Sequence, residues 1–261
     1  MKISNFNKGI ISSSAGSFWW GFLGTYYFQY ISFIGTLEVV VHRSLWTFVI
    51  LVIAISLLKK WSLFKEVFLN KNKIFYLFIT SILIFLNWTL WIYAVSTNRI
   101  IDASFGYFIF PIISVLFGFI FLNEKLNNKR IISILLVFIS TLYLSFNLIS
   151  FPWIGLSVAL LWSTYNLLRK KINVETDIGL FIESLFILPL VIIFLYFIIQ
   201  SGQNDFSINN YNIMFLIFLA GPMTVIPLFL YVRGVELCGL GPTGMIFYIT
   251  PTLQFILGYF L

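Results

Sequence analysis

Ionisable and metal-binding side chains are scarce in this sequence. Its 261 residues include one cysteine and one histidine, and Asp, Glu, Lys and Arg together make up 10%. A lone cysteine forms no internal disulfide, and a single histidine gives little support for a metal site or a catalytic triad. We therefore expect neither a metal nor a cofactor. The G-x-x-x-x-G-K-[ST], H-E-x-x-H and G-x-S-x-G motifs are also absent, so the sequence carries no signature of direct ATP drive or hydrolysis.

The low charge content also argues against a soluble protein. Soluble domains carry about 25% charged residues, whereas this chain is 60% hydrophobic with a mean hydropathy of +1.00. Such a chain could not cover its own surface in water, and a lipid bilayer removes that requirement. The net charge of +7 would suggest nucleic acid in a soluble protein. Here the cations flank apolar runs instead, so we expect the bilayer as a partner and no nucleic acid.

Nine apolar stretches are each long enough to cross a membrane, which takes about 20 residues of helix. The runs are continuous rather than alternating, and this favours helices over strands. No polar segment is long enough for a soluble domain. The expected spans are 9–29, 36–58, 73–95, 103–122, 131–149, 151–168, 178–199, 212–236 and 242–261.

Basic residues collect in every second gap between these spans. Of the 16 Lys and Arg, 13 lie in the N-terminal tail or in the gaps after spans two, four and six. They are Lys2, Lys8, Lys59, Lys60, Lys65, Lys71, Lys73, Lys125, Lys129, Arg130, Arg169, Lys170 and Lys171. Because Lys and Arg are hard to translocate, they stay on the cytoplasmic side. We expect a multi-pass protein of the cell inner (plasma) membrane with a cytoplasmic N-terminus.

A faint internal repeat occurs at a spacing of 140 residues. It maps Pro111 onto Pro251 and Arg43 onto Glu183, and it places spans two, three and four on spans seven, eight and nine. A repeat of five spans turns the second copy upside down in the membrane, as in many secondary transporters. We expect an all-α polytopic membrane protein of inverted five-helix repeats, with residues 1–149 and 150–261 as the two halves. Nine transmembrane helices of an expected ten are present, and we interpret the chain as a truncated form.

Charged residues within the spans are functional candidates, because burying them in lipid is costly. Span two holds Arg43, span seven Glu183 and span eight Arg233. Their depths predict that Glu183 pairs with Arg233. Because the repeat maps Arg233 onto Tyr93, Arg43 is in turn expected to approach Tyr93. These groups would bind charged substrate groups or hold gates. The alternative, weighed equally, is that they are structural ties between helices.

Other polar and aromatic residues suggest further roles. Glu38 and His42 lie four residues apart on one face of span two, and proton coupling through them or Glu236 stays open beside simple packing. Pro111 and Pro251 would leave carbonyl groups unbonded and serve as hinges. An aromatic pocket with hydrogen-bonding edges is expected from Asn87, Trp88, Trp91, Tyr107 and Tyr248.

Short motifs along the whole chain carry a family resemblance. They are Glu38-x3-His42-Arg43-x2-Trp46, Asn87-Trp88, the segments 103–111, 121–124 and 168–171, Ile182-Glu183, Pro189 and Gly244-x3-Tyr248-x2-Pro251-Thr252. With these motifs the chain resembles the EamA-type drug/metabolite transporter superfamily, and more closely the RarD permeases. That resemblance implies ten spans in two inverted halves and export or permeation of small organic solutes. The missing tenth span is a departure from the family pattern.

We therefore expect a secondary transporter of small organic metabolites or drugs that works by alternating access. One alternative is a membrane-embedded enzyme that modifies lipids or metabolites, which would need convergent acidic or His residues at one face. The other is a non-transporting, truncated membrane scaffold. The sequence leaves substrate, direction, coupling ion and oligomeric state open, a homodimer included.

Overall fold

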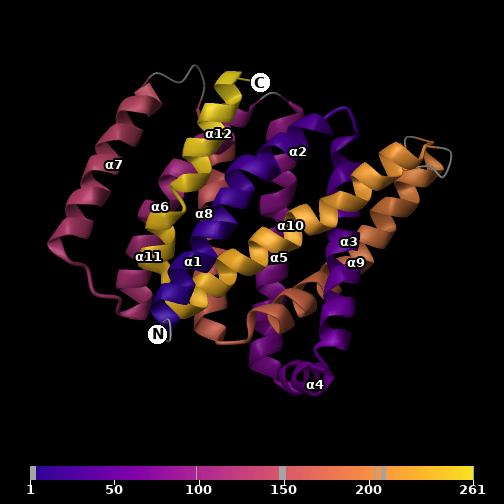
Figure 1. Cartoon of the computed structure of the whole chain (residues 1–261), viewed down its shortest axis with the longest axis horizontal. Helices are drawn as coiled ribbons and strands as arrows, with labels where there is room; N and C mark the ends of the chain where they lie inside the picture. Colours follow the sequence, from indigo (N-terminus) through magenta and orange to yellow (C-terminus); the bar gives the residue numbers. More distant parts are fainter. Residues whose placement is uncertain (1–3, 98, 147–150, 203, 207–209, 261) are drawn as a thin grey trace.

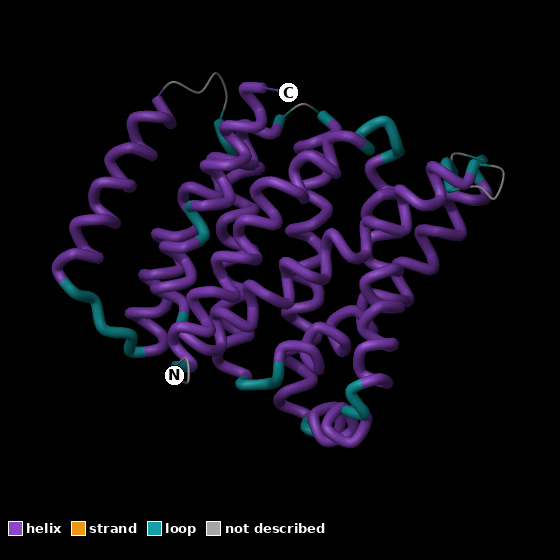
Figure 2. Tube along the Cα trace, in the orientation of Figure 1, coloured by secondary structure: helices purple, strands orange, loops and turns teal. Residues whose placement is uncertain are grey.

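The computed structural model describes residues 4–97, 99–146, 151–202, 204–206 and 210–260. Within these ranges all regular structure is helical (Figure 2). The helices, labelled in Figure 1, are α1 (Asn5–Phe18), η1 (Trp19–Gly24), α2 (Thr25–Tyr30), α3 (Thr36–Leu57), α4 (Trp61–Leu69), α5 (Lys71–Ser96), α6 (Ile100–Leu122), α7 (Asn128–Phe146), α8 (Trp153–Ile172), α9 (Thr176–Gln200), α10 (Tyr211–Cys238), α11 (Leu240–Ile246) and α12 (Ile249–Phe260).

Each expected span falls on one or more of these helices. The first span comprises α1, η1 and α2 in sequence, and the ninth comprises α11 and α12. Five described helices, α3, α5, α6, α9 and α10, contain stretches long and apolar enough to cross a bilayer. The short helix α4, in the gap after span two, was not predicted. The chain is an all-helical, polytopic membrane protein.

Asparagine and serine side chains set several helix boundaries. Ser4, Asn70 and Asn210 precede α1, α5 and α10, and each side chain accepts a hydrogen bond from a backbone N–H in the first turn. Such caps satisfy donors that have no partner within the helix. Asn123 and Asn173 follow α6 and α8 in the left-handed conformation, with φ of 53° and 51°. Asn tolerates this conformation better than most residues, so it ends a helix cleanly.

Small residues allow two pairs of helices to pack with their backbones in contact. Helices α6 and α8 cross where Gly106 meets Gly155, and a Cβ atom on Gly106 would overlap the Gly155 carbonyl oxygen. Helices α1 and α10 run side by side (Figure 1), with Gly234 of α10 against Ser13 of α1. Close approach through small residues is a main source of helix association in lipid, where burial of apolar surface gives no driving force.

Some helix contacts occur twice, between corresponding helices of the two predicted halves. Helix α1 packs along α10, and in the same way α8 packs along α5. Helix α3 packs against both α9 and α10, and α5 packs against α9. Helix α6 packs against α8, α11 and α12. In the picture α7 lies at the margin of the bundle, and among the described helices its main contact is α6 (Figure 1).

Residues related by the spacing of 140 meet where α6 contacts the segment joining α11 and α12. The rings of Tyr107 and Phe247 have centroids 5.4 Å apart. The hydroxyl of Tyr248 donates a hydrogen bond to the carbonyl oxygen of Phe108 at 3.3 Å. Each of these positions therefore contacts its own counterpart, which is what a two-fold relation between the two segments produces near its axis.

Polar contacts join the loops at opposite ends of the bundle. At one end Lys60, after α3, donates to Glu175 at 2.7 Å and to Asp177 at 2.6 Å, both at the start of α9. Burial lowers the pKa of Lys60, but hydrogen bonds and charge from Asp177 and Glu175 outweigh it, so the net shift is upward. The stability that these ion pairs of Lys60 contribute is thus present below the ordinary lysine pKa and is lost only as pH rises through the raised value.

At the other end of the bundle Glu38 accepts hydrogen bonds from the backbone N–H groups of Asp205 and Phe206, at 2.9 to 3.0 Å.

Candidate functional site

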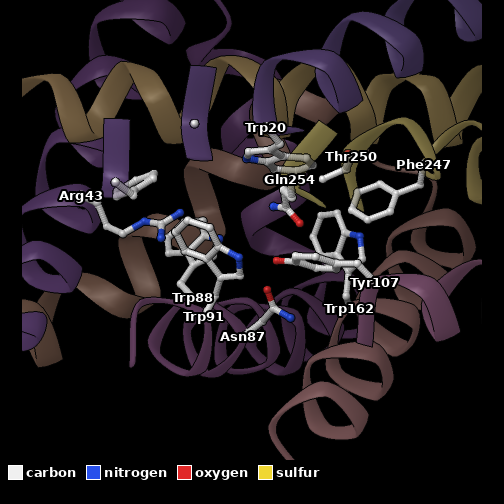
Figure 3. A pocket seen from close by; sticks show the side chains of 12 residues that line it. Trp20, Arg43, Asn87, Trp88, Trp91, Tyr107, Trp162, Phe247, Thr250 and Gln254 are labelled. Atoms are coloured by element: carbon white, nitrogen blue, oxygen red, sulfur yellow. The ribbon is translucent and has the colours of Figure 1, made fainter. Parts of the chain in front are cut away.

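A small cavity lies where the helices of the bundle meet. The space that the centre of a water molecule can occupy there is about 40 Å³, enough for a few water molecules. Figure 3 shows its side chains in close view. The lining residues come from η1, α2, α3, α5, α6, α8, the α11–α12 junction and α12, and they are Trp20, Gly24, Phe28, Arg43, Asn87, Trp88, Trp91, Tyr107, Trp162, Phe247, Thr250 and Gln254.

Two interruptions in regular helix geometry lie beside this cavity. Residues Trp19–Gly24 form a π-helix, and the Thr25 N–H bonds to the Trp20 carbonyl oxygen five residues earlier. Helix α11 ends at Ile246, and α12 begins at Ile249. Pro251 has no N–H to offer the Phe247 carbonyl, which accepts from the Thr250 N–H at 2.9 Å instead. Such irregular turns are often found at functional sites, and these two place Trp20 and Phe247 in the cavity wall.

Of the described side chains that line the cavity, Arg43 is the one with a formal charge. It is 3% exposed, and its Nε donates to the Thr224 hydroxyl of α10 at 3.1 Å. The Phe28 and Trp88 rings each lie 4.8 Å from its Cζ, within cation–π range. Its Nη1 is buried and has no hydrogen-bond partner in the described part of the chain. The hydrogen-bonding capacity of this guanidinium is therefore not fully used by the described residues.

Aromatic rings form most of the remaining wall. Trp162 contacts Trp20 edge to face at 5.5 Å between ring centroids, and Phe247 contacts Tyr107 at 5.4 Å. Such edge-to-face pairs add to the energy of burial alone. The indole Nε1 of Trp162 is a buried donor with no partner among the described residues.

Three neutral polar groups converge across this aromatic space. Figure 3 shows the carboxamides of Asn87 and Gln254 and the hydroxyl of Tyr107 pointing toward one another. The Asn87 amide nitrogen donates to the Val158 carbonyl oxygen at 3.1 Å, which holds the side chain in place. The Oε1 of Gln254 is buried and accepts no hydrogen bond from the described residues. The cavity thus combines one cation, aromatic faces and hydrogen-bonding groups.

Comparison with known proteins identifies the family. The model of the EamA-like transporter family matches residues 7–146. The chain is 33% identical over 250 residues to the protein RarD of Escherichia coli (strain K12), a match that covers 96% of this chain and 84% of that protein. The chain belongs to the EamA-like transporter family.

Other relatives agree with this assignment. The uncharacterized transporter YojE of Bacillus subtilis (strain 168) is 32% identical over 264 residues, covering 100% of this chain and 87% of YojE. A Pseudomonas aeruginosa relative named chloramphenicol-sensitive protein RarD is 24% identical over 225 residues, with 85% and 75% covered. The resemblance seen in the sequence is confirmed, and the chain is a multi-pass membrane transporter or permease. These names point to transport rather than to catalysis.

Several residues predicted to line a site in this EamA-like chain do meet in the cavity. Arg43, Asn87, Trp88, Trp91 and Tyr107 all line it. Whether they bind a solute stays a prediction.

Three other predicted residues lie elsewhere. Tyr248 bonds to the α6 backbone, and Arg233 is 44% exposed in its side chain. Tyr93 lines a separate pocket with Trp153. The predicted contact between Arg43 and Tyr93 is wrong, because Arg43 turns toward Phe28 and Trp88 instead.

Glu183 forms the centre of a second buried polar cluster. It accepts hydrogen bonds from the hydroxyls of Thr80 at 2.6 Å and Tyr165 at 3.0 Å, and its Oε1 lies 3.6 Å from the Nε of Arg169. The predicted pairing with Arg233 is wrong, because Arg233 pairs with Glu236 one turn away at 2.8 Å. The partner depends on which face of α10 turns toward α9, which depth along the membrane does not determine.

Arg169 is the charged residue that sequence reasoning placed incorrectly. It was assigned to the basic loop after span six, yet it is 2% exposed inside the bundle. Helix α8 continues to Ile172, so Arg169 lies on its inward face while Lys171 is exposed. The presence of Glu183 within a span could have indicated that Arg169 is buried, since a buried carboxylate needs a cation nearby.

The ring of Tyr165 links the Glu183 cluster to the cavity. It stacks on Trp162 with centroids 5.2 Å apart and planes 9° apart. Trp162 lines the cavity, and the Tyr165 hydroxyl donates to Glu183. A solute that moves Trp162 would therefore disturb the hydrogen bonds of the buried carboxylate.

The residues considered for proton coupling have structural partners. Glu38 bonds to the loop before α10, and the nearest Glu38 oxygen lies 3.8 Å from the Nε2 of His42. The His42 ring stacks on Phe206 at 4.7 Å. Glu236 pairs with Arg233. Proton coupling through these groups stays a prediction. Of the predicted hinges, Pro251 lies just after the α11–α12 break, while α6 continues through Pro111.

Proposed function

We propose that this EamA-like protein moves small organic solutes across the cell inner membrane by secondary transport, with the central cavity as the solute site. The observation that carries this is the cavity itself, lined by helices from both predicted halves. Transporters with inverted repeats place their site at such an interface, near irregular helix segments. The sequence has no phosphate-binding loop, so an ion or solute gradient would supply the energy.

The two halves would be residues 1–149 and 150–261, in inverted orientation. The mirrored helix contacts support this, since α1 on α10 corresponds to α8 on α5. The buried charges support it as well. Arg43 of α3 bonds to Thr224 of α10, while its counterpart Glu183 of α9 bonds to Thr80 of α5. Rocking of these halves would expose the cavity to each side in turn.

Movement is required because the cavity is small. Sites for drug-sized ligands typically measure about 300–1,000 Å³, far more than the few water molecules that fit here. The lining helices must therefore separate to admit an organic solute. Separation of the helices would break the fewest backbone hydrogen bonds at two places. These are the break between α11 and α12 and the π-helix η1 between α1 and α2.

Blocking the cavity is expected to abolish transport. Gly24 lines it, and a Cβ there would meet its nearest atoms at 3.5 and 3.6 Å, which is ordinary contact. Gly24→Ala should therefore keep its flux, while Gly24→Phe should lose more than about 90% of it by filling space that the solute needs. Flux would be measured in proteoliposomes against empty liposomes, by mass spectrometry of a solute panel that includes chloramphenicol. Equal flux through both variants would contradict the cavity as the route.

The N-terminus is proposed to be cytoplasmic, and cysteine labelling tests this. In a Cys238→Ser background, Asn173→Cys lies in the turn between α8 and α9, and Ser201→Cys lies just after α9. A membrane-impermeant thiol reagent should label Ser201→Cys on intact spheroplasts. It should label Asn7→Cys and Asn173→Cys only after permeabilisation. Labelling of Asn7→Cys and Asn173→Cys from opposite sides would refute the nine-span topology.

A further inference from the structure

Arg43 has an unusual position for a cation in the membrane. Charged side chains within membrane spans nearly always pair with an opposite charge or with backbone carbonyls. Among the described residues, Arg43 forms one hydrogen bond, with the Thr224 hydroxyl, and cation–π contacts with the rings of Phe28 and Trp88. No carboxylate forms an ion pair with it in the described part of the chain.

The counterpart of Arg43, Glu183, differs from it by having an opposite charge beside it. Glu183 has two hydroxyl donors and the Arg169 guanidinium around it. Both residues are almost fully buried, at 2% and 3% exposure. One charge thus has an opposite charge beside it, whereas the other lines the cavity with no carboxylate paired to it among the described residues. An uncompensated buried charge is costly, so an anion in the cavity would be bound strongly.

The charge of the lining selects the sign of the ligand. Aromatic boxes often bind cations through their ring faces, but Arg43 would repel a cation here. The part of the lining that the structure describes contains no Asp or Glu that could offset this repulsion. A carboxylate matches the planar fork of a guanidinium and forms short, charge-assisted hydrogen bonds with it.

The shape of the lining selects the rest of the ligand. Flat rings from Trp20, Trp91, Trp162 and Phe247 surround the space beyond Arg43. Such rings stack on other flat rings and contact their edges. The buried Oε1 of Gln254 lacks a donor among the described residues and would accept one from a polar substituent.

We infer that the solute of this cavity is a small aromatic carboxylate, with its carboxylate on Arg43 and its ring among the aromatic side chains. This inference rests on the proposed function, because it names the class of solute for the same site.

Binding measurements on the full chain test the inference directly. The protein would be placed in nanodiscs of neutral phosphatidylcholine, so that lipid charge does not attract the probes. Equilibrium dialysis near neutral pH would compare phenylacetate with phenylacetamide, 2-phenylethylamine and acetate. Phenylacetate should bind about tenfold or more tightly than the neutral amide, as expected for a hydrogen-bonded charge pair. Acetate and the amine should bind weakly.

Substitution of Arg43 provides the second arm. Arg43→Gln should remove the preference for phenylacetate over phenylacetamide, and Arg43→Lys should retain part of it. Phe197→Ala is the matched control, because Phe197 is 60% exposed on α9, outside the cavity lining. The comparison of probes on the unchanged protein needs no variant, so it stands even if Arg43→Gln does not fold.

The outcomes separate this inference from the proposed function. Equal binding of phenylacetate and phenylacetamide, or of acetate and phenylacetate, would overturn the inference. An unchanged preference in Arg43→Gln would do the same. If neutral solutes cross proteoliposomes in a Gly24-dependent way while phenylacetate does not bind, the inference fails and the proposed function stands. If phenylacetate binds through Arg43 but no solute crosses, the ligand class stands and the transport proposal fails.

Discussion

Glu183→Ala is expected to destabilise the protein by about 3–5 kcal/mol, the usual cost of leaving one member of a buried ion pair without its partner. The substitution would strand Arg169, which is 2% exposed. It would also remove the acceptor for the Tyr165 hydroxyl and one of the two acceptors near the Thr80 hydroxyl, the other being the Leu77 carbonyl oxygen. In the low-dielectric interior these losses are not replaced by water.

A double variant distinguishes a buried pair from a general loss of packing. Glu183→Leu with Arg169→Met replaces both charges by apolar side chains of similar size, and such replacements are often neutral or stabilising. We therefore expect the double variant to recover most of the stability lost in Glu183→Ala. Arg233→Ala is the control, since it breaks an exposed pair with Glu236 and should cost less than about 1 kcal/mol.

The measurement uses the single cysteine. Thermal unfolding exposes Cys238, which is half-buried at the end of α10, to a thiol-reactive dye in detergent. The melting temperature should fall strongly in Glu183→Ala and in Arg169→Ala, and much less in Arg233→Ala. If the melting temperature of Glu183→Ala equals that of the unchanged protein, the cluster contributes no net stability, and a purely functional role for Glu183 would be favoured.

Gly106→Ala is expected to have an effect of comparable size through a different cause. Its Cβ would overlap the carbonyl of Gly155, and a Cβ on Gly155 would overlap the carbonyl of Asp102. Both clashes involve backbone, which cannot rotate away, so α6 and α8 must move apart. Overpacking of this kind costs about 1–3 kcal/mol and occasionally more, which exceeds the gain of about 0.5–1 kcal/mol from placing Ala in a helix.

Gly24→Ala is the matched control for this prediction, because its new Cβ would make only ordinary contacts. It should melt at or slightly above the temperature of the unchanged protein. Gly106→Ala and Gly155→Ala should each melt lower. Their double variant should show less than the sum of the two losses, because both act on one crossing. A Gly106→Ala protein as stable as Gly24→Ala would mean that α6 and α8 do not cross in backbone contact.

Some of the residues that line the cavity could be predicted one by one from the sequence. Arg43, Asn87, Trp91 and Tyr107 were recognised because polar and aromatic groups within apolar spans stand out against their surroundings. Trp20, Trp162 and Gln254 were missed, since nothing in the sequence distinguishes their orientation from that of other rings and amides in a chain rich in aromatics. The π-turn that helps place Trp20 has no local motif that would reveal it.

The pairing of buried charges was predicted poorly for a related reason. Membrane depth follows from position along a span, so it could be estimated for Glu183 and Arg233. The rotation of each helix about its axis decides which of several residues at one depth becomes the partner. Arg169 became that partner of Glu183 because α8 extends past the apolar run and turns this one basic residue inward.

The sequence alone determined that this chain is an all-helical membrane protein, where its long apolar helices lie, and which family it belongs to. Composition, the length of apolar runs and local motifs are properties of the chain itself, and lipid leaves few structures compatible with them. Only the tertiary structure decided which residues line the cavity, which buried cation has no carboxylate paired to it in the described part of the chain, and which glycines bring helices together. These outcomes depend on the angles and rotations of packed helices, which arise from contacts between segments far apart in the sequence.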